Sequence, residues 1–114
     1  MEVETRELEP GILGIILSGK LDAAAAQQID LKFTSVAATR KAAILVDLSK
    51  VTFLASIGIR LLVSNAKAQK LRGGSMVLYQ PTELVEQVLK TTGIDEIIPI
   101  AHDMAAARGA LGFN

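Results

Sequence analysis

The hydroxyl group best placed for chemistry in this sequence belongs to Ser56, which precedes a segment of helical composition reaching Leu71. The first turn of a helix leaves backbone N–H groups unpaired and carries partial positive charge. A phosphate on Ser56 would therefore leave the helix intact while adding roughly two negative charges to the surface. A phosphorylation switch is one of two interpretations that the residues leave open. The alternative is that Ser56 serves only as a helix N-cap, which would contribute about 1 kcal/mol.

A surplus of apolar residues follows the serine. Ile57, Ile59 and Leu61 fall within the first two turns of the predicted helix, whereas an amphipathic helix buries only one stripe of its surface. Either the helix is covered on two sides, or some of these side chains form an exposed patch for a partner. Gly58 has no side chain and would let another backbone approach closely. A protein-binding surface beside Ser56 is therefore expected.

Three other groups that could act in catalysis have simpler structural explanations. His102 and Asp103 are neighbours, as an acid–base or phosphotransfer pair would be, but no nucleophile is linked to them in the sequence. Asp47 could accept a phosphate, yet the acidic pair and later lysine of receiver domains are missing. Gly73-Gly74 lacks the lysine of a phosphate-binding loop and suits a helix end. We expect no enzymatic activity.

Composition narrows the remaining function classes. The chain has 114 residues, half of them hydrophobic, which suits a single domain over residues 1–114 with an aliphatic core. It has no cysteine and one histidine, so we expect no disulfide, metal site or cofactor. Its 12 basic and 12 acidic residues cancel, which argues against nucleic-acid binding. The absence of a signal-peptide pattern and of a long apolar run predicts a cytoplasmic protein without membrane insertion.

The elements that must position Ser56 alternate along the chain. A turn at Glu9-Pro10-Gly11 joins the first two predicted strands, which must therefore pair antiparallel. Pro99 places the last strand at a sheet edge. The alternation predicts an α/β fold whose other strands are mostly parallel. Strands are predicted at residues 3–8, 12–17, 42–46, 76–79 and 97–100, with a loop at 47–50 and a short apolar stretch at 51–54. Helices are predicted at 23–38, with Asp22 as the cap, at 57–71 directly after Ser56, and at 81–92 and 103–111.

Four segments, taken in order and spacing, resemble the STAS domain family over nearly the whole chain. They are residues 17–22 (LSGKLD), 46–49 (VDLS), 53–58 (FLASIG) and 89–95 (LKTTGID). Within that family the chain is most similar to the stand-alone anti-sigma factor antagonists. The resemblance implies a STAS-like mixed sheet, with an antiparallel first hairpin, mostly parallel remaining strands and about four helices.

The resemblance also implies a mechanism. Such an antagonist binds an anti-sigma factor serine kinase while unphosphorylated, is released when its switch serine is phosphorylated, and is restored by a phosphatase. By motif, that serine is Ser56, and Asp22 matches an acidic residue near the partner surface. The family usually has Asp where Ala55 stands here and a second Ser or Thr where Ile57 stands, which puts recognition by a standard kinase in doubt. The partner-binding residues expected are Asp22, Ala55, Ile57, Gly58, Ile59 and Arg60.

Two further possibilities follow from the same helix surface. Some stand-alone domains of this family serve as subunits of lipid or other ABC-type transporters and bind the ATPase without phosphorylation. Ala55 slightly favours that alternative, because it removes the usual carboxylate before the switch serine. A weak homodimer through the apolar helix surface is the second possibility.

Overall fold

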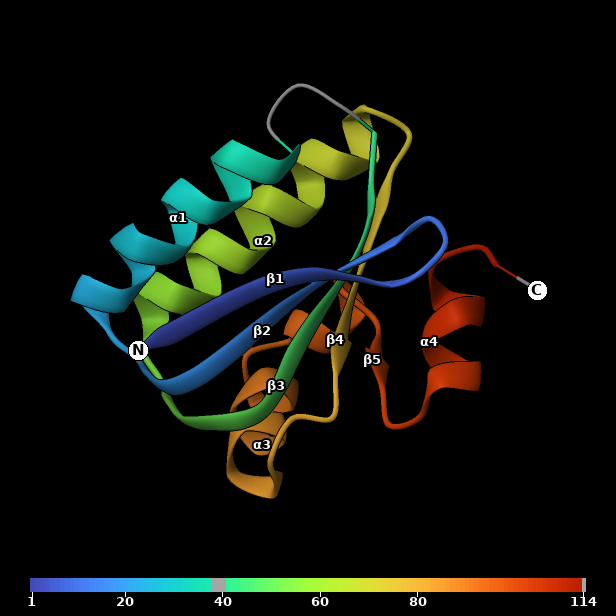
Figure 1. The fold of residues 1–114 in the computed structure, drawn as a ribbon. Helices are drawn as coiled ribbons and strands as arrows, with labels where there is room; N and C mark the ends of the chain where they lie inside the picture. Colours follow the sequence, from blue (N-terminus) through green and yellow to red (C-terminus); the bar gives the residue numbers. More distant parts are fainter. Residues whose placement is uncertain (38–40, 114) are drawn as a thin grey trace.

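Five strands form one mixed sheet in the computed structural model, which describes residues 1–37 and 41–113 apart from the side chains of residues 36 and 37 (Figure 1). β1 (Glu2–Glu9) pairs antiparallel with β2 (Ile12–Leu21). The next strands, β3 (Ala43–Leu54), β4 (Ser75–Tyr79) and β5 (Ile100–Ala101), follow in spatial order and pair parallel. The predicted mixed sheet with an antiparallel first hairpin is confirmed.

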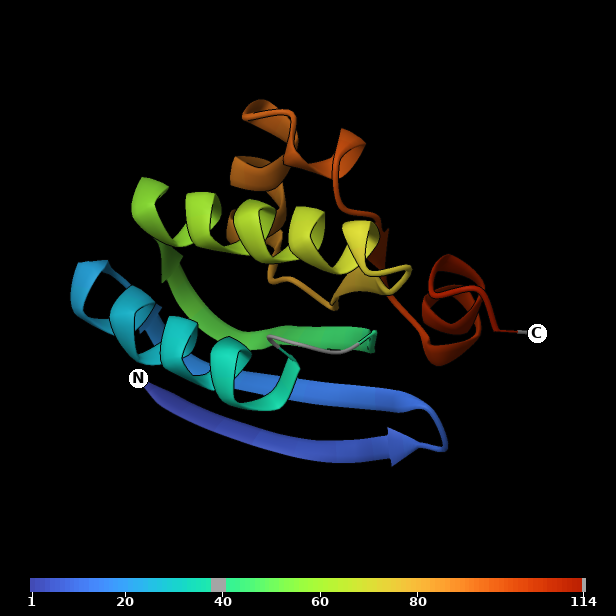
Figure 2. The same cartoon turned by 90° about the horizontal axis from the view of Figure 1, so that it is seen from above.

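Four helices within the described residues cover the two faces of this sheet. They are α1 (Ala23–Ala37), α2 (Ser56–Leu71), α3 (Glu83–Thr91) and α4 (Met104–Ala110), and a short 3-10 turn follows α3 at Ile94–Glu96. α1 and α2 lie side by side over one face, and α4 lies apart from them (Figures 1 and 2). The predicted end of the first helix at residue 38 lies outside the described residues.

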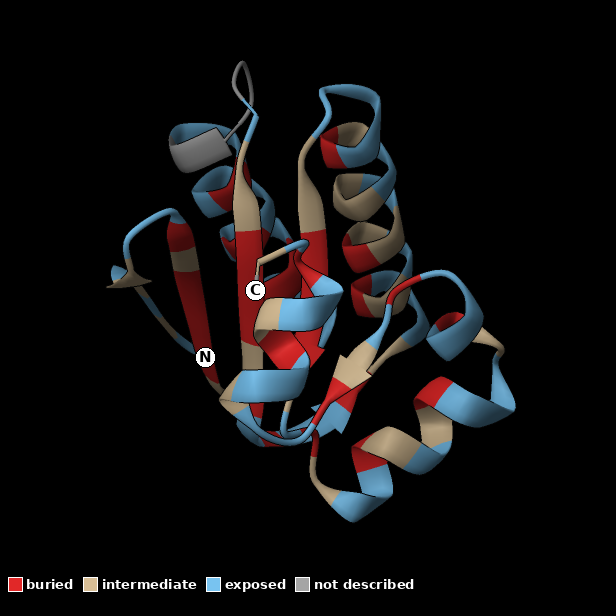
Figure 3. Cartoon of the chain, turned by 90° about the vertical axis from the view of Figure 1, so that its right-hand side faces the viewer, coloured by how far each residue is buried: buried red, intermediate tan, exposed pale blue. Residues whose placement is uncertain are grey.

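Alternation along the central strand divides the core into two clusters. Ile44 and Val46 of β3 belong to the larger cluster with residues of α1, α2 and α3, whereas Leu45 points the other way, into a smaller cluster with residues of α4. Figure 3 shows the central strands buried between these layers. The larger cluster also receives Ile29 and Phe33 of α1, four residues apart on one helix face. The expected aliphatic core is confirmed, and Phe33 is the one fully buried aromatic residue in the part of the chain that the structure describes.

Two strands are longer than the sequence pattern predicts. β2 continues past residue 17 to Leu21, and β3 passes through residues 47–50, which were expected to form a loop. The two strands stay paired as far as Leu21 and Leu54, with register shifts after Ile16 and after Gly19 that absorb the irregular sequence. Gly19 has a φ of +108°, which only glycine adopts without strain. Pairing between strands therefore overrides the local turn signals.

The last strand is shorter than predicted and displaced. β5 comprises only Ile100 and Ala101, whereas the prediction was residues 97–100. Pro99 has no N–H to donate to a ladder, and Ile97 is the residue that ends the preceding 3-10 turn. The edge position is confirmed, since β5 pairs only with β4.

Candidate functional site

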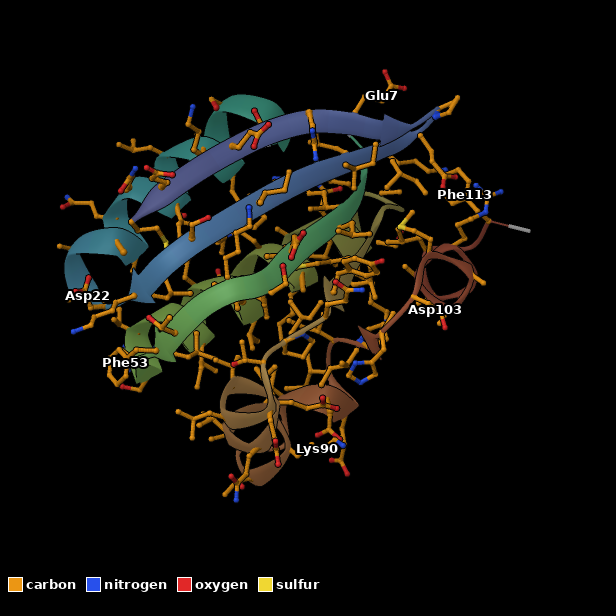
Figure 4. All side chains as sticks on the ribbon, turned by 60° about the horizontal axis from the view of Figure 1, so that its bottom comes forward. Glu7, Asp22, Phe53, Lys90, Asp103 and Phe113 are labelled. Atoms are coloured by element: carbon orange, nitrogen blue, oxygen red, sulfur yellow. The ribbon has the colours of Figure 1, made fainter. Side chains whose placement is uncertain are left out.

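The two loops that carry the predicted site residues are held together by the sheet. Leu21 at the end of β2 is the register partner of Leu54 at the end of β3. One residue further, the Ala55 N–H donates a hydrogen bond of 2.9 Å to the Leu21 carbonyl. Asp22 and Phe53 therefore lie at the same end of the molecule (Figure 4). Sequence segments more than thirty residues apart thus form one surface, as is common at the carboxyl ends of parallel strands.

Ser56 is the first residue of α2, and the residue in the N-cap position is Ala55. The alternative interpretation, in which Ser56 is the N-cap, is therefore wrong. Ala55 keeps an extended backbone, with φ −80° and ψ 158°, because its N–H completes the pairing with β2, and the helix begins only after it. Alanine has no side-chain acceptor, so among the described residues no side chain caps the first turn of α2. The Ser56 side chain is exposed and forms no hydrogen bond to the described residues.

Asp22 caps α1, as the sequence predicts. Its Oδ1 accepts a hydrogen bond of 3.0 Å from the Ala25 N–H, and its carbonyl accepts one of 2.9 Å from the Ala26 N–H. Asp22 is itself exposed. Capping occupies one carboxylate oxygen, so the side chain can still face a partner, and that second role stays a prediction.

Packing inside the protein explains why position 58 is a glycine. An added Cβ at this position would lie 2.5 Å from Cγ of Leu21, a side chain with no solvent exposure. The expected close approach at Gly58 is therefore real, but it is made by a leucine side chain of β2 and not by another backbone. Gly58 allows the first turn of α2 to pack onto the end of β2, which fixes where Ser56 emerges. Its direct contact with a partner stays a prediction.

The apolar surplus at the start of α2 is partly exposed, as expected. Ile57 is 43% exposed, Ile59 is intermediate and Leu62 is buried. Arg60 is exposed one turn after Ser56. Phe53 is 49% exposed and was not among the predicted partner-binding residues. We call the surface formed by Phe53, Ala55, Ser56, Ile57 and Arg60 the switch surface.

A signal for Phe53 was present in the sequence but was ambiguous. Thr52 and Phe53 are both exposed, between the buried Val51 and Leu54. Regular alternation would bury every second residue, and the register shift between β2 and β3 beside Phe53 breaks that pattern. An apolar residue in a short strand is ordinarily assigned to the core, so only the observed register shows that Phe53 is exposed.

A groove of about 600 Å³ opens between α1 and α2, directly beside the switch surface. Ile57 belongs both to the groove wall and to the switch surface, so the two features are continuous. Sequence reasoning did not find this groove, because it depends on how two helices lie against each other. Its lining residues are Ala23, Ala26, Gln27, Asp30, Ile57, Arg60, Leu61, Ser64 and Asn65.

The other candidate groups lie outside this surface. Asp47 lies within β3 and not at its end, and its Oδ1 accepts hydrogen bonds from the Ser49 N–H at 2.9 Å and the Ser49 hydroxyl at 2.7 Å. Gly73 has a φ of +83°, and the Gly74 N–H donates to the Gln69 carbonyl at 2.7 Å. This geometry is a helix end of the Schellman type. The structural explanation of Gly73-Gly74 is confirmed.

His102 takes part in a surface ion-pair cluster. Its Nε2 lies 3.2 Å from Oε2 of Glu86, and Nζ of Lys90 lies 3.1 Å from the same oxygen. Partial burial raises the pKa of Glu86, but the hydrogen bonds and charges of Lys90 and His102 outweigh this and hold the pKa below its ordinary 4.5. Asp103 caps α4 by accepting a hydrogen bond of 2.8 Å from the Ala106 N–H. His102 thus lies exposed in a surface ion pair and Asp103 acts as a helix cap, which are the structural explanations that apply to this pair. Separately, none of the helices in the described ranges has the length and apolar character needed to cross a bilayer.

Comparisons with known proteins agree with this architecture. BtrV of Bordetella bronchiseptica, which carries the name of an anti-sigma factor antagonist, is 26% identical over 100 residues, covering 88% of this chain and 86% of BtrV. The crystal structure of an anti-sigma factor antagonist from Mycobacterium paratuberculosis superposes with a TM-score of 0.82 at 22% identity, covering 97% of this chain and 95% of that one.

SpoIIAA has been solved in two states that both share this fold. The unphosphorylated form gives a TM-score of 0.76 at 19% identity, covering 99% of each chain. The phosphorylated form, from Bacillus, gives 0.70 at 22% identity, covering 92% of this chain and 96% of that one. The sequence profile of the STAS domain matches residues 5–107. With a mixed five-stranded sheet, an exposed serine at the start of α2 and a family match over most of its length, this chain belongs to the STAS domain family.

Proposed function

We propose that this protein is an anti-sigma factor antagonist that binds an anti-sigma factor serine kinase while Ser56 is unphosphorylated and is released when Ser56 is phosphorylated. The observation that carries the proposal is the exposed Ser56 side chain at the uncapped start of α2, with the exposed apolar residues Phe53 and Ile57 close to it in the sequence. The name of the relative BtrV supports the same function. In this proposal the 114 residues act as one module in the cytoplasm and catalyse nothing.

The geometry accounts for how a phosphate would act. Phosphoserine carries close to two negative charges and three acceptor oxygens. At the first position of a helix, the macrodipole favours the negative charges and the free N–H groups can donate to the phosphate oxygens. Phosphorylation therefore leaves the fold intact. A partner packed on Phe53 and Ile57 would instead meet a desolvated charge, which is costly without a counter-charge. Binding is lost while the protein stays folded, and a phosphatase reverses the change.

Asp22 and Ala55 modify this surface without blocking the switch. The hydrogen bond between Ala55 and Leu21 holds Asp22, the residue after Leu21, next to the switch surface. One of its carboxylate oxygens caps α1, and the other is available to the partner. Ala55 removes a carboxylate from the position before Ser56, which makes the surface more apolar. The kinase that recognises it is therefore expected to depend less on acidic residues beside the phosphoacceptor.

The proposal is tested with the purified serine-kinase anti-sigma factor of the same organism and ATP. Mass spectrometry should place one phosphate on Ser56, and Ser56→Ala should abolish it while preserving binding in titration calorimetry. Ser56→Asp should weaken binding at least tenfold. The control is Ser35→Asp, which changes an exposed serine near the C-terminal end of α1 and should leave binding unchanged. The proposal fails if no phosphate is found on Ser56 and Ser56→Asp binds normally. Copurification with a transporter ATPase, in place of the kinase, would favour the transporter alternative.

A further inference from the structure

The apolar lining of the groove between α1 and α2 suits the binding of a helix. Its apolar wall consists of Ala23 and Ala26 on α1 and Ile57 and Leu61 on α2, at spacings of three and four residues. Such spacings place side chains in one row on each helix. Figure 2 shows α1 and α2 side by side, so the two rows flank a common channel. Ala26 is buried and forms the floor of the groove, whereas the exposed Ala23 is small enough to let a bound backbone come close. Ile57 and Leu61 offer a larger contact area.

The length of the groove limits what can occupy it. The row on α1 extends from Ala23 to Asp30, and a rise of 1.5 Å per residue makes it roughly 10 Å long. That is about two helical turns. An amphipathic helix of two to three turns, with apolar residues at i and i+3 or i+4, matches both this length and the apolar rows, which is the usual helix-in-groove mode of recognition.

The rims of the groove carry opposite charges. Asp30 lies on the α1 rim and Arg60 on the α2 rim, and both are exposed. Within the part of the chain that the structure describes, neither takes part in an ion pair. Rim charges of this kind set orientation and partner choice more than raw affinity. An occupant should therefore carry a basic residue opposite Asp30 and an acidic residue opposite Arg60.

We propose that the α1–α2 groove receives a short amphipathic helix of the anti-sigma factor kinase, oriented by a basic residue on Asp30 and an acidic residue on Arg60. This inference rests on the proposed function and deepens it. It also gives phosphorylation a specific target. Arg60 follows Ser56 by four residues and so lies one turn away on the same helix face. A phosphate on Ser56 competes for Arg60 and repels the acidic residue of the partner helix.

The occupant is identified by photo-crosslinking to the purified kinase. The crosslinker p-benzoylphenylalanine is placed at Gln27 or Ser64, exposed groove residues on α1 and α2, and in a control at Gln87, an exposed residue of α3. The proposal expects both groove positions to crosslink to the same amphipathic helix of the kinase, and position 87 not to. Crosslinks to a second copy of this chain, or to a non-helical segment of the kinase, would overturn the proposal. So would normal binding of the kinase with no crosslink from either groove position.

Charge reversal tests the orientation. Asp30→Lys and Arg60→Glu should each weaken kinase binding roughly five- to tenfold, whereas Glu83→Lys on α3 should leave it unchanged. The losses from Arg60→Glu and Ser56→Asp should be less than additive, because both act on one acidic residue of the partner. Unchanged affinity in both reversed variants would overturn the groove proposal alone. If the kinase does not bind the unaltered protein at all, the proposed function fails and this inference fails with it.

Discussion

The uncapped start of α2 leads to a prediction about stability. Ala55 occupies the N-cap with the extended backbone that a capping residue adopts, but it has no acceptor atom. Replacing it by aspartate places a carboxylate where it can accept a hydrogen bond from the N–H groups of the first turn, without changing the backbone. Ala55→Asp is therefore expected to stabilise the protein, although it introduces a charge on an intermediate-exposure position.

The size of the gain follows from the other helices of the same molecule. Asp22, Thr82 and Asp103 cap α1, α3 and α4 with hydrogen bonds of 3.0, 3.3 and 2.8 Å. Such caps contribute about 1 kcal/mol each, and a negative charge at a helix start adds roughly 0.3–1 kcal/mol. Repulsion from Asp22, which adjoins the residue hydrogen-bonded to Ala55, offsets part of that second contribution. The net gain should be about 1 kcal/mol, or a rise in Tm of roughly 4 °C.

The assay is urea denaturation followed by circular dichroism, because the chain contains no tryptophan for fluorescence. Ala55→Asn supplies the acceptor without the charge and should be stabilised by a similar amount. Comparing the Asp and Asn variants separates the hydrogen bond from the electrostatic contributions. Ala55→Val supplies no acceptor and serves as the matched control, with a change of less than about 0.5 kcal/mol expected.

Unchanged stability in both polar variants would contradict this prediction. If the Asp and Asn variants both unfold at the same urea concentration as the unaltered protein, the first-turn N–H groups of α2 gain nothing from an acceptor at position 55. These N–H groups would then offer no stabilisation to a phosphate on Ser56 either. A gain in the Asn variant alone would instead mean that repulsion from Asp22 cancels both the favourable charge contribution and the hydrogen-bond gain in the Asp variant.

Two further predictions concern packing and pH. Gly58→Ala should destabilise the protein by about 1–3 kcal/mol in urea denaturation, because its Cβ would meet the fully buried Leu21 at 2.5 Å, outweighing the helix preference of alanine. Gly109→Ala, whose Cβ meets nothing within 4 Å, should be neutral or slightly stabilising, and equal losses at both sites would contradict this explanation. The pKa of Glu86 is lower folded than unfolded, so its contribution is present above the ordinary value of 4.5 and is lost as the pH falls through the folded pKa. Glu86→Gln should therefore reduce the loss of stability on acidification from pH 6 to pH 3, and identical pH profiles would contradict that assignment.

Features that depend on neighbouring residues could be predicted from the sequence. Residues close in sequence decide the antiparallel first hairpin, the cap at Asp22 and the helix end at Gly73. The placement of a serine at the start of a helix beside exposed isoleucine could also be predicted. These predictions succeed because caps, turns and helical spacing are local properties, decided within a few residues.

The tertiary structure alone decided the details that make the site specific. The bond from Ala55 to Leu21 joins segments 34 residues apart and moves the cap from Ser56 to Ala55. The paired register of β2 and β3 extends both strands and leaves Phe53 exposed. The groove exists only because α1 and α2 lie side by side on one face of the sheet. Each of these features depends on contacts between distant segments, and local sequence patterns carry no information about which distant groups will meet.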